Sequence, residues 1–130
     1  MNYGIQKMQP EKWAAPPSID EWLKEAKSTA GCTVYLLHNS TVRAADSEGK
    51  SMKGIFFDYD QVKLSRTVEE SRQIPGISFI KVWLNVGHLK TGEDIMYVMV
   101  GGDRRPIVMQ TLQELVGRIK GDVITVREEY

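Results

Sequence analysis

Residues 103–127, DRRPIVMQTLQELVGRIKGDVITVR, carry the clearest helical pattern in this chain of 130 residues. Apolar residues recur there at spacings of three and four, as on one buried face of an amphipathic helix. These residues are Val108, Leu112, Leu115, Val116 and Ile119. Asp103 is a typical N-cap, Pro106 suits the first turn, and Gly121 predicts a left-handed stop. A short strand is expected to follow at residues 123–127.

The rest of the chain alternates short helical and strand patterns. Ser18 with Glu21 forms a capping-box pattern that predicts a helix, and residues 61–73 predict a second one. Clusters of β-branched and aromatic residues predict strands at residues 32–38, 52–59, 77–86 and 94–100. The last of these is apolar on both faces, which favours a central position in the sheet. Residues 87–92 have the composition of a turn. Because turns join neighbouring strands, we expect an α+β fold with mostly antiparallel pairs and flanking helices.

Two segments are expected along the chain. Residues 1–17 are polar and contain three prolines, which predicts an extended N-terminal arm with Trp13 as a candidate anchor. Residues 18–130 are long enough for one hydrophobic core and predict a single domain.

The composition excludes several classes of protein. Seventeen basic and 17 acidic residues cancel, so no overall field favours nucleic acid or an anionic membrane. The apolar runs are too short to span a bilayer, and the first residues lack the apolar core of a signal peptide. The single cysteine, Cys32, cannot form an internal disulfide and fits a reducing cytoplasm. We expect it to be a small buried residue in an apolar strand.

The common metal and cofactor motifs are missing from the sequence. Cys32, His38 and His88 show no metal-ligand spacing, and neither a nucleotide-binding glycine loop nor a GxSxG motif is found. We therefore expect no metal and no bound cofactor. Gly101-Gly102 could let backbone amides approach an anion at the helix start.

Four cations lie outside the obvious surface positions of helices. Arg43 lies in a polar loop, Arg104 at a helix start, Lys120 at a helix end and Arg127 in the last strand. Arg104 faces the positive end of the helix dipole, which favours an anion nearby. If the four converged, they could bind a phosphate or carboxylate, and the lysine could serve acid–base or acyl chemistry. Alternatively they are solvated charges, and Lys120 only complements the helix dipole.

The order and spacing of several short segments, over about residues 31–130, resemble the large, catalytic subunit of molybdopterin synthase. The shared segments are Val42-Arg43, Gly87-His88-Leu89, Gly92-Glu93-Asp94-Ile95, Asp103-Arg104, Ile119-Lys120 and Arg127-Glu128-Glu129. The resemblance implies an α/β hammerhead-type fold and a homodimer within a heterotetramer. It also implies a small ubiquitin-like sulfur carrier at each end, with a thiocarboxylated Gly-Gly C-terminus. Sulfur would pass from this carrier to cyclic pyranopterin monophosphate and form the dithiolene of molybdopterin.

The resemblance also implies roles for individual residues. Lys120 matches an essential lysine and Arg127 stands where a second lysine is usual, so both are candidate catalytic residues. Arg43 and Arg104 match substrate-binding arginines. Two further residues of the expected substrate site depart from the family pattern: Asp103 replaces a histidine, and His38 replaces an aromatic residue. These departures leave a second hypothesis, a non-catalytic relative that binds the carrier or a pterin without turnover, and a third, a plain dimeric structural domain.

Overall fold

Two antiparallel three-stranded sheets organise residues 14–130, the part of the chain that this computed structural model describes. The larger sheet has the order β1 (Val34–Thr41), β5 (Asp94–Gly102), β3 (Ile77–Leu84). The smaller sheet has the order β4 (Gly87–Lys90), β2 (Gly54–Tyr59), β6 (Ile124–Glu129). The helices are α2 (Ile19–Lys27), α3 (Gln61–Arg72), α4 (Arg105–Arg118) and the π-helical turn η1 (Ile119–Val123). The α+β class with mostly antiparallel strands and flanking helices is confirmed.

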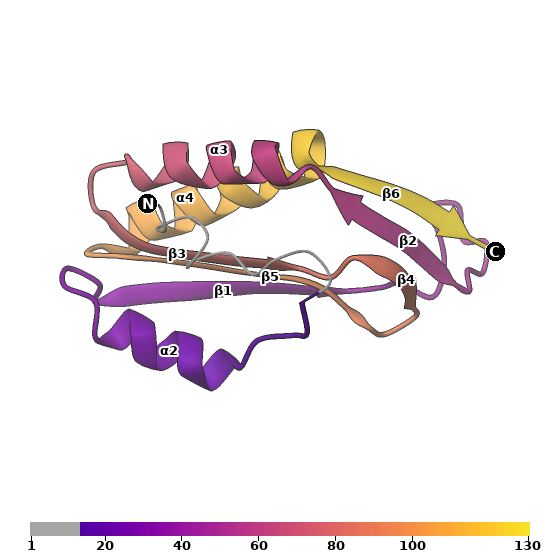
Figure 1. The fold of residues 1–130 in the computed structure, drawn as a ribbon, viewed down its shortest axis with the longest axis horizontal. Helices are drawn as coiled ribbons and strands as arrows, with labels where there is room; N and C mark the ends of the chain where they lie inside the picture. Colours follow the sequence, from indigo (N-terminus) through magenta and orange to yellow (C-terminus); the bar gives the residue numbers. More distant parts are fainter. Residues whose placement is uncertain (1–13) are drawn as a thin grey trace.

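Helices cover both faces of the larger sheet, and the smaller sheet extends from one end of it (Figure 1). α3 and α4 pack against one face, where Val98 and Val100 of β5 are fully buried. α2 packs against the opposite face through Trp22 and Ala26, which contact Met99. β5 is therefore buried on both faces, as its sequence predicts for a central strand.

The start and end of α4 differ from the sequence expectation. Arg104, not Asp103, occupies the N-cap position, and its side chain makes no capping hydrogen bond. The carbonyl of Asp103 accepts a hydrogen bond at 3.1 Å from the hydroxyl of Thr33, the residue before β1. Gly121 does not adopt a left-handed conformation. α4 continues directly into η1, and this wider turn buries both Ile119 and Val123 in the core.

The segment expected to be a turn at residues 87–92 is mostly strand. Gly87–Lys90 forms β4 and pairs with β2, and positive φ angles occur at Gly87, where β4 begins, and at Gly92, which follows it. The two backbones approach closely because Gly54 has no side chain. A Cβ atom there would lie 1.9 Å from the carbonyl oxygen of Leu89. A glycine inside a strand can signal such an approach, but the sequence does not show which strand comes close.

Residues 14–17 precede α2 without regular structure, and the Ala14 carbonyl accepts a hydrogen bond from the Trp83 indole at 3.1 Å. Trp13 and the rest of the expected arm lie outside the described residues. The boundary between an arm and a single domain therefore stays a prediction. No helix among residues 14–130 is long and apolar enough to cross a membrane.

Candidate functional site

A pocket of about 390 Å³ lies between the smaller sheet, η1 and the loop of residues 42–53. We call it the Lys120 pocket. Its floor is apolar, with Ile55 and Phe57 of β2 and Met96 of β5, and its rim is charged. This volume and this mixture of an apolar floor with a few polar groups are typical of small-molecule sites.

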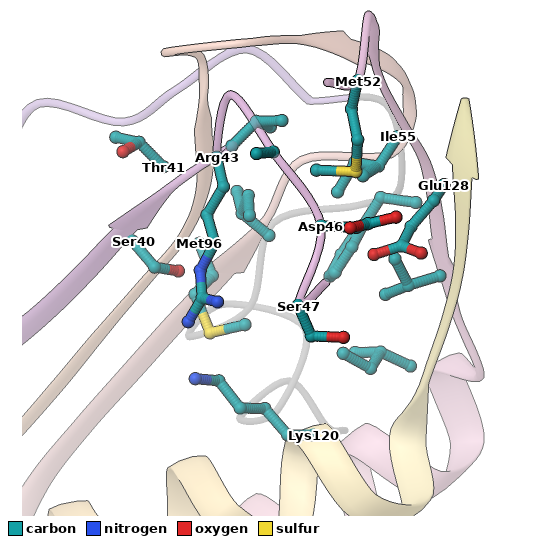
Figure 2. Close-up of a pocket in the computed structure, with 16 residues that line it drawn as sticks. Ser40, Thr41, Arg43, Asp46, Ser47, Met52, Ile55, Met96, Lys120 and Glu128 are labelled. Atoms are coloured by element: carbon teal, nitrogen blue, oxygen red, sulfur yellow. The ribbon is translucent and has the colours of Figure 1, made fainter. Parts of the chain in front are cut away.

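Two cations reach the pocket from distant parts of the sequence. Arg43 comes from the loop and Lys120 from η1, and their charged groups point toward one another across the opening (Figure 2). Neither head group forms a hydrogen bond or ion pair with another residue in the described part of the chain. Two neighbouring cations that have no ion-pair partner can bind an anion such as a phosphate or carboxylate.

The other side of the rim is acidic. The hydroxyl of Tyr130 donates to Asp46 Oδ2 at 2.6 Å and lies 3.0 Å from Glu128 Oε1. The hydrogen bond from Tyr130, followed by those from the loop backbone, holds the pKa of Asp46 below its usual value. The pocket therefore has a cationic side and an anionic side, which orients any ligand that carries charge at one end.

This acidic side was missed in the sequence, although a signal for it existed. Along β6, Val126 and Glu128 line the pocket while Arg127 does not, which follows from the alternation of side chains in a strand. The strand predicted at residues 123–127 stops short of Glu128, whereas β6 runs to Glu129, and its alternation places Glu128 and Arg127 on opposite faces. The partnership of Glu128 with Tyr130 and Asp46 depends on a contact between distant segments, and no local pattern reports it.

His38 and Ser40 lie beside the pocket on β1. Ser40 lines it, whereas His38 lines an adjoining apolar groove between β1 and α4. Ser40 Oγ and His38 Nε2 are buried and have no hydrogen-bond partner among the described residues. Burial lowers the pKa of His38, and the positive charge of Lys120 lowers it further. His38 is therefore a neutral imidazole next to Lys120 at neutral pH.

Three other predicted site residues lie elsewhere in this chain. Arg127 is on the outer face of the smaller sheet, with its guanidinium 4.6 Å from the ring centre of Phe56. Asp103 and Arg104 precede α4, whereas Lys120 follows it. A helix of 14 residues spans about 21 Å, so these two residues are at the far end from the pocket. The structure thus brings Arg43 and Lys120 together, with His38 beside them, but does not bring Asp103, Arg104 or Arg127 to the same pocket.

Other candidate sites in the sequence have structural explanations. Gly101 and Gly102 end β5 and are buried, so they serve close packing and do not open an anion site. Cys32 is buried, and this burial raises the pKa of its thiol, which disfavours the reactive thiolate. No group of three or more His, Cys, Asp or Glu side chains among residues 14–130 could hold a metal ion.

The family model described as MoaE protein matches residues 13–122, which is most of the chain. The chain belongs to the MoaE protein family. No protein of curated function matches its sequence. Membership of this family supports a role in molybdopterin synthesis.

Solved structures of the MoaE fold confirm the architecture at low sequence identity. Molybdopterin synthase from Staphylococcus aureus has a TM-score of 0.72 and 16% identity, over 88% of this chain and 86% of that one. A complex of subunits 1 and 2 of molybdopterin-converting factor from Helicobacter pylori 26695 has a TM-score of 0.70 and 16% identity, over 85% and 74%. The molybdopterin biosynthesis MoaE protein from Burkholderia ambifaria MC40-6 has a TM-score of 0.66 and 14% identity, over 92% and 86%. At these identities the likeness shows a shared fold.

Proposed function

We propose that this chain is the large subunit of a molybdopterin synthase. It transfers sulfur from the thiocarboxylated C-terminus of a small ubiquitin-like carrier to cyclic pyranopterin monophosphate and so forms the molybdopterin dithiolene. The observation that carries the proposal is the convergence of Arg43 and Lys120 on one side of the pocket, where neither head group has an ion-pair partner among the described residues. Both reactants are anions, because one carries a phosphate and the other a thiocarboxylate.

Arg43 and Lys120 would have different tasks in this reaction. The planar guanidinium of Arg43 suits bidentate binding of the substrate phosphate. At each of the two dithiolene carbons a carrier sulfur forms a C–S bond while a C–O bond breaks, and the oxygen leaves as water or on the opened cyclic phosphate. Water then hydrolyses each carrier thioester, which releases the carrier as a carboxylate and leaves the sulfur on the substrate, so no oxidant or reductant is needed. The ammonium of Lys120 would stabilise the negative oxygen that develops on the acyl carbon during this step. Since the sulfur arrives on the carrier, the buried Cys32 is not required.

The remaining predicted residues fit this proposal only in an assembly. If Arg104 contacts the substrate, the length of α4 requires that it come from a second copy of the chain. A homodimer is therefore part of the proposal, together with the small carrier subunit. A solved relative is itself a complex of two subunits of molybdopterin-converting factor.

A reconstituted reaction tests the proposal. Purified chain, thiocarboxylated carrier and cyclic pyranopterin monophosphate should yield dithiolene, and Lys120→Ala should lower the rate on the order of 100-fold or more. Lys27→Ala is the matched control, because Lys27 lies at the end of α2, far in sequence from the pocket, and makes no ion pair within the described residues. Circular dichroism should show that both variants fold. Equal rates for Lys120→Ala and Lys27→Ala would remove Lys120 from the mechanism.

The position of Arg127 favours a second candidate, a relative that binds the carrier or a pterin without turnover. Arg127 stands where the resemblance places a second catalytic lysine, yet its guanidinium packs on Phe56 outside the pocket, and Glu128 faces inward. Such a protein would bind a peptide ending in thiocarboxylated Gly-Gly but would form no dithiolene. Single-turnover measurement at saturating carrier separates the two functions.

A further inference from the structure

The loop of residues 42–53 is an internally bonded unit. The backbone NH of Asp46 donates to the Lys50 carbonyl at 2.9 Å. The side-chain oxygen Oδ1 of Asp46 accepts bonds from the backbone NH groups of Glu48 and Lys50, each at 2.9 Å. Asp46 therefore organises the tip of the loop, and Arg43 lies three residues before it. Arg43 is at the base of this loop: Val42 before it is bonded to Glu93, and Ala44 after it is bonded to Met52 in the short ladder that leads through Ala45 and Ser51 to the tip.

One side chain from outside the loop holds this tip in place. Tyr130 follows β6 and donates its hydroxyl to Asp46 Oδ2 at 2.6 Å, while the ammonium of Lys50 lies 4.4 Å from the centre of its ring. The two carboxylate oxygens of Asp46 therefore have different partners. Oδ1 binds backbone NH groups within the loop, and Oδ2 binds the hydroxyl of Tyr130, which follows β6. Tyr130 and Asp46 are far apart in the sequence, so this contact closes a long loop of chain.

We propose that Tyr130 is a positioning residue that clamps Asp46 and thereby keeps Arg43 opposite Lys120 across the pocket. The inference rests on the proposed function in one respect, that Arg43 and Lys120 bind the anionic substrate. Tyr130 itself does not contact the cationic side of the pocket. Its effect on the reaction passes through the loop.

The chemistry of the clamp fits a holding role. A phenol hydroxyl has one proton, and two carboxylates, Asp46 and Glu128, lie within hydrogen-bond distance of it. The shorter distance assigns the proton to Asp46, so the bond is a charge-assisted one, which is stronger than a bond between neutral groups. These carboxylates raise the pKa of Tyr130 far above its ordinary value, so the hydroxyl remains a donor at any physiological pH.

Hydrogen exchange tests the clamp directly. Tyr130→Phe removes the hydroxyl and keeps the ring beside Lys50, and it should speed amide exchange in residues 44–52 about tenfold. Tyr35→Phe is the matched control, because the Tyr35 hydroxyl makes no hydrogen bond within the described residues. Exchange in residues 44–52 of the Tyr130→Phe variant as slow as in the wild type would overturn the proposal.

Steady-state kinetics separates positioning from a merely structural role. In Tyr130→Phe, KM for the pterin substrate should rise about fivefold while kcat stays within about twofold, because Arg43 is displaced and Lys120 is not. A lower kcat at unchanged KM would contradict the proposal. The exchange measurement needs no turnover, so a wild-type chain that forms no dithiolene would refute the proposed function and leave the clamp to be decided by exchange.

Discussion

His38 is a half-buried imidazole whose pKa is lowered in the folded protein, first by burial and then by the positive charge of Lys120. The unfolded chain binds a proton at about pH 6.5, so the folded state loses stability as the pH falls below that value toward the lower folded pKa. Above about pH 6.5 the neutral imidazole imposes no such cost.

We predict that His38→Gln flattens this pH dependence. Glutamine keeps a polar side chain of similar size but has no group that titrates, so the melting temperature should fall less between pH 7.5 and pH 5 than in the wild type. Thermal unfolding followed by circular dichroism measures both curves. His88→Gln serves as control, because His88 is exposed and pairs with Glu129 at 2.7 Å. Parallel curves for His38→Gln and the wild type would show that folding does not lower the pKa of His38.

Individual residues show where reading the sequence succeeds and where it stops. Strand alternation alone places Ile80 and Trp83 on opposite faces of β3, and the structure agrees. No local spacing shows that Arg43 and Lys120 meet in the fold. From the residues alone this was one of two alternatives, and the family resemblance favoured it. For Arg127 the resemblance was misleading. It matched this residue to a family lysine by position in the sequence, but it did not show on which face of β6 the side chain would lie.

At the scale of elements, the ends of β5 and α4 were the hardest to predict, because tertiary contacts decide them. Gly102 ends β5 so close to the turn at Gly76 that an added Cβ would lie 2.1 Å from the Gly76 carbonyl oxygen. Gly121 lies within η1, whose extra width follows from the burial of Ile119 and Val123. Periodicity predicted the body of each element well, and packing determined where each one stopped.

Two glycines on neighbouring elements should therefore respond to alanine in opposite ways. Gly102→Ala forces backbone apart at the end of β5 and should destabilise the protein by about 1–3 kcal/mol. Gly117→Ala adds a methyl group to an exposed position inside α4 with no atom within 4 Å, and should stabilise it by about 0.5–1 kcal/mol. Denaturant unfolding measures both. A neutral Gly102→Ala would mean that β5 can shift at little cost.

At the scale of the whole molecule, the cations expected to form one anion site lie in two groups in a single chain, separated by about the length of α4. Arg43 and Lys120 lie at the junction with the smaller sheet, and Arg104 lies at the opposite end of α4. β1 is an edge strand of the larger sheet, and Leu37 on it is partly exposed. A symmetric dimer could bring Arg104 of one copy to the pocket of another, because a twofold axis exchanges opposite ends.

Mixing two inactive variants would test whether the site is shared between copies. We expect Lys120→Ala and Arg104→Ala to be impaired separately, and a mixture that exchanges subunits to recover about a quarter of the wild-type activity, since half the dimers are mixed and each has one intact site. The control is a chain that carries both substitutions. Taken through the same subunit-exchange procedure, it should recover no activity. Activity of the mixture no higher than the mean of its parents would show that Arg104 does not act across a dimer. Arg104 would then have no part in the Lys120 pocket, because α4 holds the two residues apart in a single chain.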